Sequence, residues 1–467
     1  MTSQRKSDTL TVMKHKKRIN MTTWQILALG YIFVIIIGAG LLCLPIATHA
    51  GESTSFLNAL FTSVSATCVT GLVPYDTNTH WTLFGEIVII CLIQLGGLGF
   101  MTFVTIVFEL FGKNMGLSGS KLLMASAGQD QRNGLRRIFK RLLIGTLLFE
   151  GLGAGILSIR FIQDFGVLKG IYYAVWHSVS AFCNAGFDLM GGVFDGETFV
   201  SFTHYATDPI VSLTIPCLIL IGGLGFCVWD DILECKFNPK KFRLHTRVVL
   251  IMSVILVIIP TALFVLFEWN NPTYANYRFG ERILIGFFNA VTPRTAGFNT
   301  VDMTQFTDGS YLLTLLLMFI GGSSGSTAGG VKLTTTFVIF MAIGSVFRSH
   351  RDIEVGKRRV NDSLVRQAFT IFVCCLTAIF LSTLCICVIE RTNEAATLQA
   401  VLFETVSAMG TVGLSLGLTP TLSAASKIIL ILMMYAGRVG ILTLGLAIGE
   451  KKTNAEIRKP IGNLLIG

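Results

Sequence analysis

Charged residues are scarce in this chain. Asp, Glu, Lys and Arg make up 14% of its 467 residues, whereas a typical soluble domain carries about 25%. The chain also lacks a G-x-x-x-x-G-K-[ST] segment for nucleotide phosphates and any C-x-x-C pair with the spacing of a zinc site. These absences exclude a soluble globular protein, a P-loop within the chain and a cysteine-based metal framework. With 52% hydrophobic residues, the composition predicts an integral membrane protein.

Eight apolar runs are long enough to cross a hydrocarbon layer of about 30 Å as helices. They lie at approximately 24–44, 82–110, 142–160, 210–229, 247–267, 311–346, 367–389 and 425–448. The run at 311–346 is overlong and contains a cluster of glycines, so we expect its helix to be interrupted.

Basic residues are distributed unevenly between these runs. Most of the 37 Lys and Arg residues lie near the two ends of the chain and in three loops, at 112–141, 230–247 and 346–366. Three other connecting stretches contain acidic residues but no Lys or Arg, at 72–80, 187–208 and 298–310. Because cytoplasmic loops are enriched in Lys and Arg, we expect a multi-pass protein of the cell membrane with both termini in the cytoplasm.

Four short segments recur along the chain, and each is closed by a glycine. The glycines follow one another at intervals of 115, 111 and 116 residues, and the next residue is always Leu or Phe. The apolar stretches that precede them are too short to cross a bilayer. The segments expected to line an ion path are Val69-Thr70-Gly71, Asn184-Ala185-Gly186, Thr295-Ala296-Gly297 and Thr411-Val412-Gly413.

Each segment belongs to a larger repeat, in which a long apolar run precedes it and a second long run follows it. Two crossings return the chain to its starting side, so the four repeats share one orientation and can surround one axis. An inverted-repeat transporter needs an odd number of crossings per repeat. The sequence therefore predicts an all-α membrane protein with eight transmembrane helices and four re-entrant pore helices around a central pore. The expected units are a cytoplasmic N-terminus at 1–20, repeats at 21–125, 126–240, 241–360 and 361–450, and a cytoplasmic C-terminus at 451–467.

The glycine-ended segments have the chemistry of a cation filter. A short helix descending from the outer side would direct the negative end of its dipole toward the centre. The chain would then return in extended form, with carbonyl oxygens replacing the hydration shell of an ion. Glycine suits this turn because it accepts a positive φ and adds no side chain. A single glycine would equally indicate close helix packing, but four at matching offsets favour a pore.

These residues resemble the Trk/Ktr/HKT superfamily of potassium transporters, and most closely its bacterial KtrB-type membrane subunits. The resemblance covers nearly the whole chain (20–467) and rests on the four segments, the glycine-rich stretch of the third repeat and the pair Gly437-Arg438. It implies a homodimer with one pore per subunit, potassium as substrate, no cofactor bound by this chain, and sodium-stimulated uptake. It further implies a cytoplasmic ring of nucleotide-binding RCK subunits of the KtrA type. In plant relatives a serine at the first filter position accompanies sodium selectivity, so Gly71 indicates potassium.

A cluster of small residues interrupts the third repeat. Its five glycines would each cost about 1 kcal/mol relative to alanine in a helix interior, and its Ser and Thr side chains compete for backbone hydrogen bonds. We expect a loop across the cavity below the filter that acts as a gate, as the resemblance also implies; a kinked helix is the alternative. The expected gate comprises Gly321, Gly322, Ser323, Ser324, Gly325, Ser326, Thr327, Ala328, Gly329, Gly330 and, in the fourth repeat, Arg438.

Several charged residues fall within or beside apolar segments, where an unpaired charge costs at least about 2.5 kcal/mol. We expect Arg438 either to hold the gate loop through carbonyl oxygens or to form a packing salt bridge. Lys332 is expected to extend toward the cytoplasm. Arg294 is expected to turn away from the pore, toward carbonyl oxygens or Glu404. His177 and Glu404 share one offset in their repeats and are expected to be structural supports.

Three other functions compete with a potassium pathway. The stretch 321–325 fits G-x-S-x-G, but no partner histidine or strand–turn–helix context accompanies it, which argues against an enzyme. A non-conducting scaffold or receptor would not need intact filter glycines. Within transport, a sodium-preferring or non-selective cation pathway is the alternative. The four segments are unequal, and only Thr411-Val412-Gly413 approaches the TVGYG sequence of potassium channels.

Overall fold

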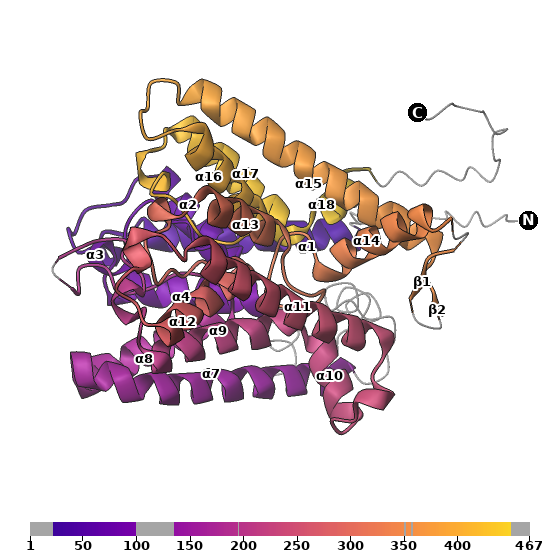
Figure 1. Cartoon of the computed structure of the whole chain (residues 1–467). Helices are drawn as coiled ribbons and strands as arrows, with labels where there is room; N and C mark the ends of the chain where they lie inside the picture. The colour runs from indigo at the N-terminus through magenta and orange to yellow at the C-terminus, as the bar shows by residue number, and fades with distance from the viewer. Residues whose placement is uncertain (1–21, 100–134, 195, 350–351, 356–357, 450–467) are drawn as a thin grey trace, which may run out of the picture.

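The computed structural model describes residues 22–99, 135–194, 196–349, 352–355 and 358–449. Almost all regular structure in this part of the chain is helical, and most helices run between two ends of the molecule (Figure 1). A hairpin of β1 (Glu354–Val355) and β2 (Arg358–Arg359) projects from one of these ends. Its two strands are antiparallel, with Glu354 opposite Arg359.

Three helices follow one another in the same order four times. The first is long: α1 (Thr23–Leu42), α7 (Leu135–Phe165), α11 (Leu244–Phe267) and α15 (Asp362–Ile389). The second is shorter: α2 (Phe56–Thr67), α8 (Val167–Phe182), α12 (Phe279–Val291) and α16 (Leu398–Gly410). The third follows a loop: α4 (Leu83–Leu98), α9 (Pro209–Leu224), α13 (Asp308–Phe319) and α17 (Ala424–Val439). The repeat seen in the sequence is therefore also a repeat of secondary structure.

Local signals set where these helices begin. At α1, Thr22 and Gln25 form a capping box, in which each side chain accepts the backbone N–H of the other residue. At α9, the Asp208 carboxylate accepts the N–H groups of Ile210 and Val211. The loops contain the short helix α3 (Thr77–His80) and 3-10 turns at Pro45–Ala47, Thr203–Tyr205, Pro239–Lys241, Pro272–Tyr274, Met303–Gln305 and Thr419–Thr421.

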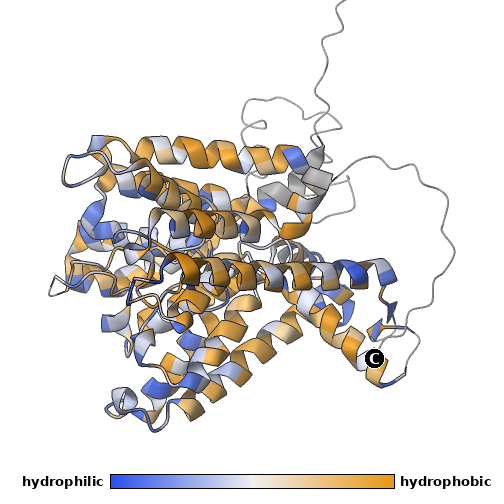
Figure 2. Ribbon diagram, turned by 90° about the horizontal axis from the view of Figure 1, so that it is seen from above, coloured by the Kyte–Doolittle hydropathy of each residue, from blue (hydrophilic) through white to orange (hydrophobic). Residues whose placement is uncertain are grey.

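The long helices consist largely of hydrophobic residues (Figure 2), and many of their apolar side chains are exposed. Leu148 of α7, Ile258 of α11 and Phe380 of α15 are 56%, 62% and 69% exposed. Water would oppose this exposure by about 25 cal/mol per Å² of apolar surface, whereas hydrocarbon does not. Since α1, α7, α11 and α15 are also long and apolar enough to cross a bilayer, the chain is a multi-pass membrane protein.

A glycine follows the third helix in three repeats, and in two of them a further helix follows that glycine. Gly99, Gly225 and Gly440 come directly after α4, α9 and α17, with φ values of 83°, 94° and 91° that favour glycine. α10 (Phe226–Glu234) leaves α9 at 84°, and α18 (Ile441–Gly449) continues from α17. Of the eight runs expected to be spans, four are single long helices among the described residues, or five if α9 and α10 count as one.

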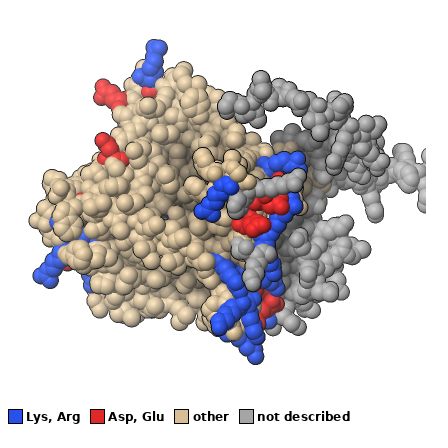
Figure 3. Space-filling model, turned by 45° about the vertical axis from the view of Figure 1, so that its right-hand side comes forward, with Lys and Arg blue, Asp and Glu red and all other residues tan. Residues whose placement is uncertain are grey.

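Charged side chains gather at one end of the molecule. Figure 3 shows Lys and Arg concentrated on the end that carries α10, α14 (Leu333–Phe347) and the hairpin, beside a wide face without charged groups. Arg141 pairs with Asp230 of α10 at 2.7 Å, which joins the start of α7 to this end. Most of the expected basic loop 112–141 lies outside the described residues.

The buried core lies between neighbouring repeats. One large cluster joins the first and second repeats through residues such as Trp81 and Trp176. A second large cluster joins the first, third and fourth repeats and includes Phe61 and Phe403. Because each repeat packs against the next, the short helices α2, α8, α12 and α16 are held toward the middle of the molecule.

Candidate ion pathway

The four short helices end just before the glycine-ended segments, and the backbone then takes the same path in each. The residue two positions before each glycine lies in the left-handed region: Val69 (58°), Asn184 (60°), Thr295 (67°) and Thr411 (51°). The glycines follow with positive φ values: Gly71 (95°), Gly186 (72°), Gly297 (81°) and Gly413 (93°). Positive φ is uncommon for residues other than glycine, so its recurrence at one offset defines a shared loop conformation.

The four glycines form a closed ring. A Cβ atom on any of them would lie less than 3.0 Å from the next segment, a separation that real Cβ atoms do not show. Cβ atoms on Gly71, Gly186, Gly297 and Gly413 would meet the carbonyl oxygens of Ala185, Ala296, Val412 and Thr70, respectively. The contacts run from each repeat to the next and from the fourth back to the first. The structure thus brings all four sequence-predicted segments together around one axis, and only glycine fits at their point of closest approach.

A serine six residues before the glycine supports three of the segments. Ser65 Oγ accepts the N–H of Gly71 at 3.0 Å. Ser407 Oγ accepts the N–H of Gly413 at the same distance. Ser180 instead donates to the carbonyl of the residue after its glycine, at 2.7 Å. This supporting role of the serines was not predicted, although serine recurs at the same offset before the glycine in three repeats.

The third segment is supported differently. It has Val291 where the other repeats have serine. The hydroxyl of the next residue, Thr292, donates to the carbonyl of Phe298 at 2.5 Å. The four segments therefore share a backbone path but not the side chains that hold it.

The four glycine-ended segments are called filter segments below, after the role that the sequence predicts for them. Their carbonyl oxygens have no hydrogen-bond donor among the described residues. This holds for all three residues of each segment, from Val69 to Gly71 and at the matching positions of the other repeats. Buried carbonyl oxygens are normally paired. A ring of unpaired carbonyl oxygens is the arrangement that replaces the hydration shell of a monovalent cation.

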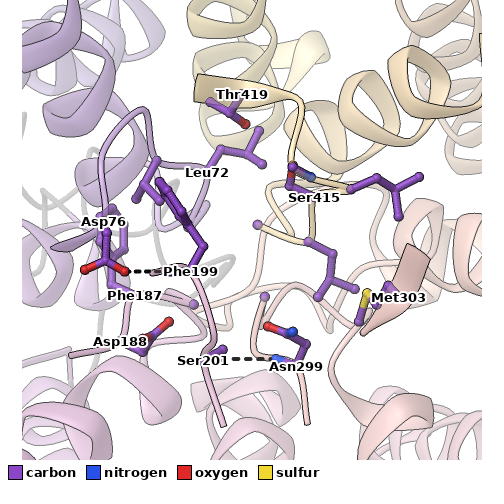
Figure 4. Close-up of a pocket in the computed structure, with 18 of the residues that line it drawn as sticks. Leu72, Asp76, Phe187, Asp188, Phe199, Ser201, Asn299, Met303, Ser415 and Thr419 are labelled. Atoms are coloured by element: carbon purple, nitrogen blue, oxygen red, sulfur yellow. Dashed lines mark hydrogen bonds between the residues drawn. The ribbon is translucent and has the colours of Figure 1, made fainter. Parts of the chain in front are cut away.

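A pocket of about 380 Å³ opens on one side of the glycine ring. The four glycines line it, together with the loops that follow them (Figure 4). Three acidic side chains also line it: Asp76, Asp188 and Asp302. Asp76 accepts the N–H groups of Thr79 and Phe199, so it also ties two loops together.

Asp188 follows the second segment in the loop after α8, and its carboxylate is directed into this pocket (Figure 4). Burial, and then the negative charge of Asp76, raise the pKa of Asp188 to about 7. Hydrogen bonds from the Met190 N–H and the Ser201 hydroxyl offset this only in part. The charge of the pocket therefore changes near neutral pH. In the sequence this residue belongs to the acidic stretch 187–208, and no motif there indicates a role for it.

The glycine-rich stretch of the third repeat is a loop and not a kinked helix. α13 ends at Phe319 and α14 begins at Leu333. At the base of the loop Ile320 and Val331 form a parallel bridge, and the Gly321 N–H donates to the Val331 carbonyl at 2.9 Å. The two ends of the loop therefore lie side by side.

This loop packs against the filter segments on the side opposite the pocket. The Thr327 hydroxyl lies 3.3 Å from the carbonyl of Phe182, the last residue of α8. A Cβ on Gly329 would collide with the Thr411 hydroxyl of the fourth segment. Both contacts are made to residues that precede the filter glycines, whereas the pocket is lined by the glycines and the residues after them.

Arg438 links the loop to two other repeats through backbone carbonyls. Its guanidinium donates to the carbonyl oxygens of Thr327 and Gly96. One of its two terminal nitrogens also lies 3.5 Å from the carbonyl oxygen of Gly97. No carboxylate among the described residues pairs with it. Of the two expectations for this residue, the carbonyl contact is correct and the packing salt bridge is wrong.

Two other predicted charge positions need correction. Lys332 does not extend away from the loop, because its Nζ donates to the Ala328 carbonyl at 2.7 Å. Arg294 does turn away from the glycine ring, but its guanidinium lies 3.4 Å from the Ser253 hydroxyl and not at Glu404. Its side chain is held among helices α11 and α12 and is 5% exposed.

His177 and Glu404 make the contacts of structural supports. His177 Nδ1 lies 2.7 Å from the Tyr173 carbonyl, and its Nε2 accepts the Leu189 N–H at 3.0 Å. This pair of bonds requires the tautomer that is protonated at Nδ1. Glu404 accepts the hydroxyls of Ser415, at 2.8 Å, and Thr419. Each residue fastens the loop that follows the filter segment of its own repeat.

Three further glycines, not singled out for this role by the sequence, let α4, α9 and α17 approach the short helices. A Cβ on Gly96, Gly222 or Gly437 would collide with the carbonyl of the residue four positions before the filter glycine. Gly437 therefore corresponds to Gly96, and Arg438 occupies the position of Gly97. In the G-x-S-x-G stretch, the Ser323 hydroxyl is directed to the neighbouring Ser324 carbonyl.

Comparisons with known proteins agree with this geometry. The family described as "TrkH: Cation transport protein" matches residues 7–455. The potassium/sodium uptake protein NtpJ of Enterococcus hirae is 36% identical, over 98% of this chain and 100% of that protein. The Ktr system potassium uptake protein B of Bacillus subtilis is 39% identical over the same shares. That of Vibrio alginolyticus is 38% identical, over 95% and 94% of the two chains.

The fold has a counterpart among solved structures. The potassium transporter TrkH from Vibrio parahaemolyticus superposes with a TM-score of 0.69, at 18% identity, over 93% of this chain and 86% of that one. The family consists of transport proteins and not enzymes. With nearly its whole length matched, the chain belongs to the TrkH family of cation transport proteins.

Proposed function

We propose that this protein takes up potassium across the cell membrane through a filter built from its four glycine-ended segments. The observation that carries the proposal is the closed ring of Gly71, Gly186, Gly297 and Gly413, bordered by carbonyl oxygens that accept no hydrogen bond from the described residues. Such a ring can coordinate a dehydrated monovalent cation. The printed names of the relatives, potassium uptake and potassium/sodium uptake proteins, support the choice of ion.

In this proposal the four repeats are parallel units around one pore, each with two membrane-crossing segments and one re-entrant pore helix. Both termini and the charged end of Figure 3 face the cytoplasm, since Lys and Arg mark the cytoplasmic side. The 380 Å³ pocket is then the outer mouth. The protein acts as a homodimer, and its uptake is stimulated by sodium.

The loop of residues 321–330 is the proposed gate. Its contacts with Phe182 and Thr411 put it directly under two filter segments, and the Arg438 guanidinium holds it there. A cytoplasmic ring of nucleotide-binding RCK subunits controls its position. The relatives named as Ktr system proteins support a partner component.

Ion flux into liposomes containing the purified chain tests the function. We expect uptake of potassium and its analogue rubidium to exceed uptake of sodium at equal concentrations. Liposomes without protein supply the background. Absence of any cation flux above that background would exclude the proposed function.

Gly71→Ser tests the filter assignment. A side chain here would collide with the Ala185 carbonyl and would also strain a residue with φ 95°. Because the added side chain would displace a carbonyl of the neighbouring segment, we expect the potassium-to-sodium uptake ratio to fall at least about fivefold, which corresponds to about 1 kcal/mol. An unchanged ratio in a variant that still conducts would remove Gly71 from the filter.

A non-selective monovalent cation pathway is the second candidate. It is favoured by the unequal support of the four segments, in particular the replacement of serine by Val291 in the third. Equal uptake of potassium and sodium by the unmodified chain would establish it in place of potassium selectivity.

A further inference from the structure

The Asn184 side chain lies at a junction of three segments. It is 1% exposed. Its amide nitrogen donates to the Arg294 carbonyl at 3.2 Å and lies 3.3 Å from the Thr295 hydroxyl. Its amide oxygen accepts the Thr327 hydroxyl at 3.2 Å. One buried amide therefore joins the second filter segment to the third and to the loop of residues 321–330.

The matching positions in the other repeats make no such link. Val69 has no polar side chain, and Thr295 only accepts from Asn184. The Thr411 hydroxyl is buried, has no hydrogen-bond partner in the part of the chain that the structure describes, and abuts Gly329 of the loop. Asn184 is thus the single position of the four, all within the described residues, whose side chain binds both a neighbouring filter segment and the loop.

Thr327 is held from two directions. Its carbonyl accepts the Arg438 guanidinium. Its hydroxyl lies within reach of two acceptors, the Phe182 carbonyl at 3.3 Å and the Asn184 amide oxygen at 3.2 Å. A hydroxyl has one proton to donate, so these two acceptors share it.

The junction is closely packed. A Cβ added to Gly222 would lie 3.0 Å from the Thr327 hydroxyl and 3.1 Å from the Asn184 amide oxygen. If the loop moved away, the Asn184 oxygen would lose its partner in a buried place, and an unpaired buried acceptor is unfavourable. The position of the loop and the orientation of the Asn184 amide are therefore linked.

We propose that Asn184 and Thr327 couple the gate to the filter. With the loop in place, Thr327 fixes the orientation in which the Asn184 amide braces the second filter segment against the third. When the loop withdraws, the amide is released and the two segments are no longer held at one separation. The ion preference of the filter thus depends on the gate, and Asn184 acts as a positioning residue through its side chain. This inference rests on the proposed function.

Thr327→Val tests the coupling, because valine keeps the shape of threonine and removes the hydroxyl. The measurement is the ratio of rubidium to sodium uptake by liposomes containing the full chain. We expect this ratio to fall about fivefold, the effect of one hydrogen bond. Thr327→Ser retains the hydroxyl, so it should keep the ratio of the unmodified chain. Thr327→Ala is measured in parallel, so that a second variant without the hydroxyl is available if the valine variant does not reconstitute.

Thr370→Val is the matched control, because it makes the same change at a residue outside the filter segments and the loop. Its hydroxyl is exposed and donates to the Arg366 carbonyl within α15 at 2.9 Å. We expect it to leave the ratio unaltered. In Asn184→Leu, further substitution of Thr327 by valine should lower the ratio no more than Asn184→Leu alone, because both changes remove the same bond.

Two outcomes would overturn the coupling while leaving the proposed function intact. One is an unchanged ratio in conducting Thr327→Val and Thr327→Ala proteins. The other is additive effects in the double variant, which would mean that the two residues act independently. Failure of the unmodified chain to transport potassium is a separate result, which would overturn the proposed function itself.

Discussion

Asp188 shows how one residue can set a property of the pocket that we propose as the outer mouth. It lines the pocket above the glycine ring, and its carboxylate is directed into it (Figure 4). Asp76 and Asp302 line the same pocket, and like Asp188 they accept backbone N–H groups of the loops. Because burial and Asp76 raise the pKa of Asp188 to about 7, its negative charge is present above neutral pH and is lost as pH falls through that value.

We expect the Michaelis constant for potassium uptake to rise as the outer pH is lowered from 8 to 6. Loss of one nearby negative charge weakens attraction of a cation by roughly 1 kcal/mol in a water-filled mouth, which corresponds to roughly fivefold in affinity. Uptake of rubidium into liposomes at a series of external pH values measures this. Asp188→Asn should show the raised constant at every pH, and a persistent pH dependence in this variant would assign the effect to another group.

At the scale of single residues, the glycines could be predicted from the sequence, whereas the contacts of buried charges could not. The four filter glycines were predicted because they recur at one offset. The contacts of Arg294 and Lys332 were not, since a charge in an apolar segment needs a partner that only the fold identifies. Ser253 and Ala328 are those partners. No repeat or motif singles out Ser253, and although Ala328 lies in the predicted gate stretch, nothing in the sequence pairs its carbonyl with Lys332.

Among the helices, the third one of each repeat differs most clearly from the prediction. Hydropathy predicted continuous spans because Leu, Ile and Gly are all compatible with an apolar run. It could not reveal that Gly99, Gly225 and Gly440 adopt positive φ, which depends on tertiary packing. The interruption at 321–330 was predicted, since five glycines in ten residues are too many for a stable helix interior.

Deleting residues 323–328 tests the role of this loop. The bridge between Ile320 and Val331 holds the ends of the loop together, so a shorter connection can close without moving α13 or α14. We expect potassium flux in the absence of any partner protein to rise about tenfold, since the deletion removes Thr327 and with it the charged hydrogen bond from Arg438.

Initial rates of rubidium uptake, compared with those of the unmodified chain, measure the change. Elution of the shortened protein at its usual position in size-exclusion chromatography shows that it has folded. Unchanged flux in such a protein would contradict a gating role for the loop.

At the scale of the whole molecule, four unequal repeats close into one ring. Because each repeat has an even number of predicted membrane crossings, the four segments were predicted to share one orientation. The number of crossings did not predict that each glycine would contact the next repeat in cyclic order, which follows from the close approach of the four backbones. The repeats differ in what surrounds the ring. The first and fourth use Ser65 and Ser407 as supports, the second carries Asn184, and the third supplies the loop.

A closed ring implies that all four glycines matter alike for selectivity. Gly413→Ser, and likewise serine at 186 and 297, should lower the potassium-to-sodium uptake ratio by at least about fivefold, because each added side chain meets a carbonyl of the next segment. Gly417→Ser is the matched control: Gly417 also has positive φ, 83°, and lies only four residues beyond Gly413, but a Cβ there meets no atom within 4 Å. Backbone strain alone would affect both variants, whereas the ring predicts a loss of selectivity in Gly413→Ser and none in Gly417→Ser. Equal ratios for the two proteins would mean that the fourth segment does not contribute to ion selection.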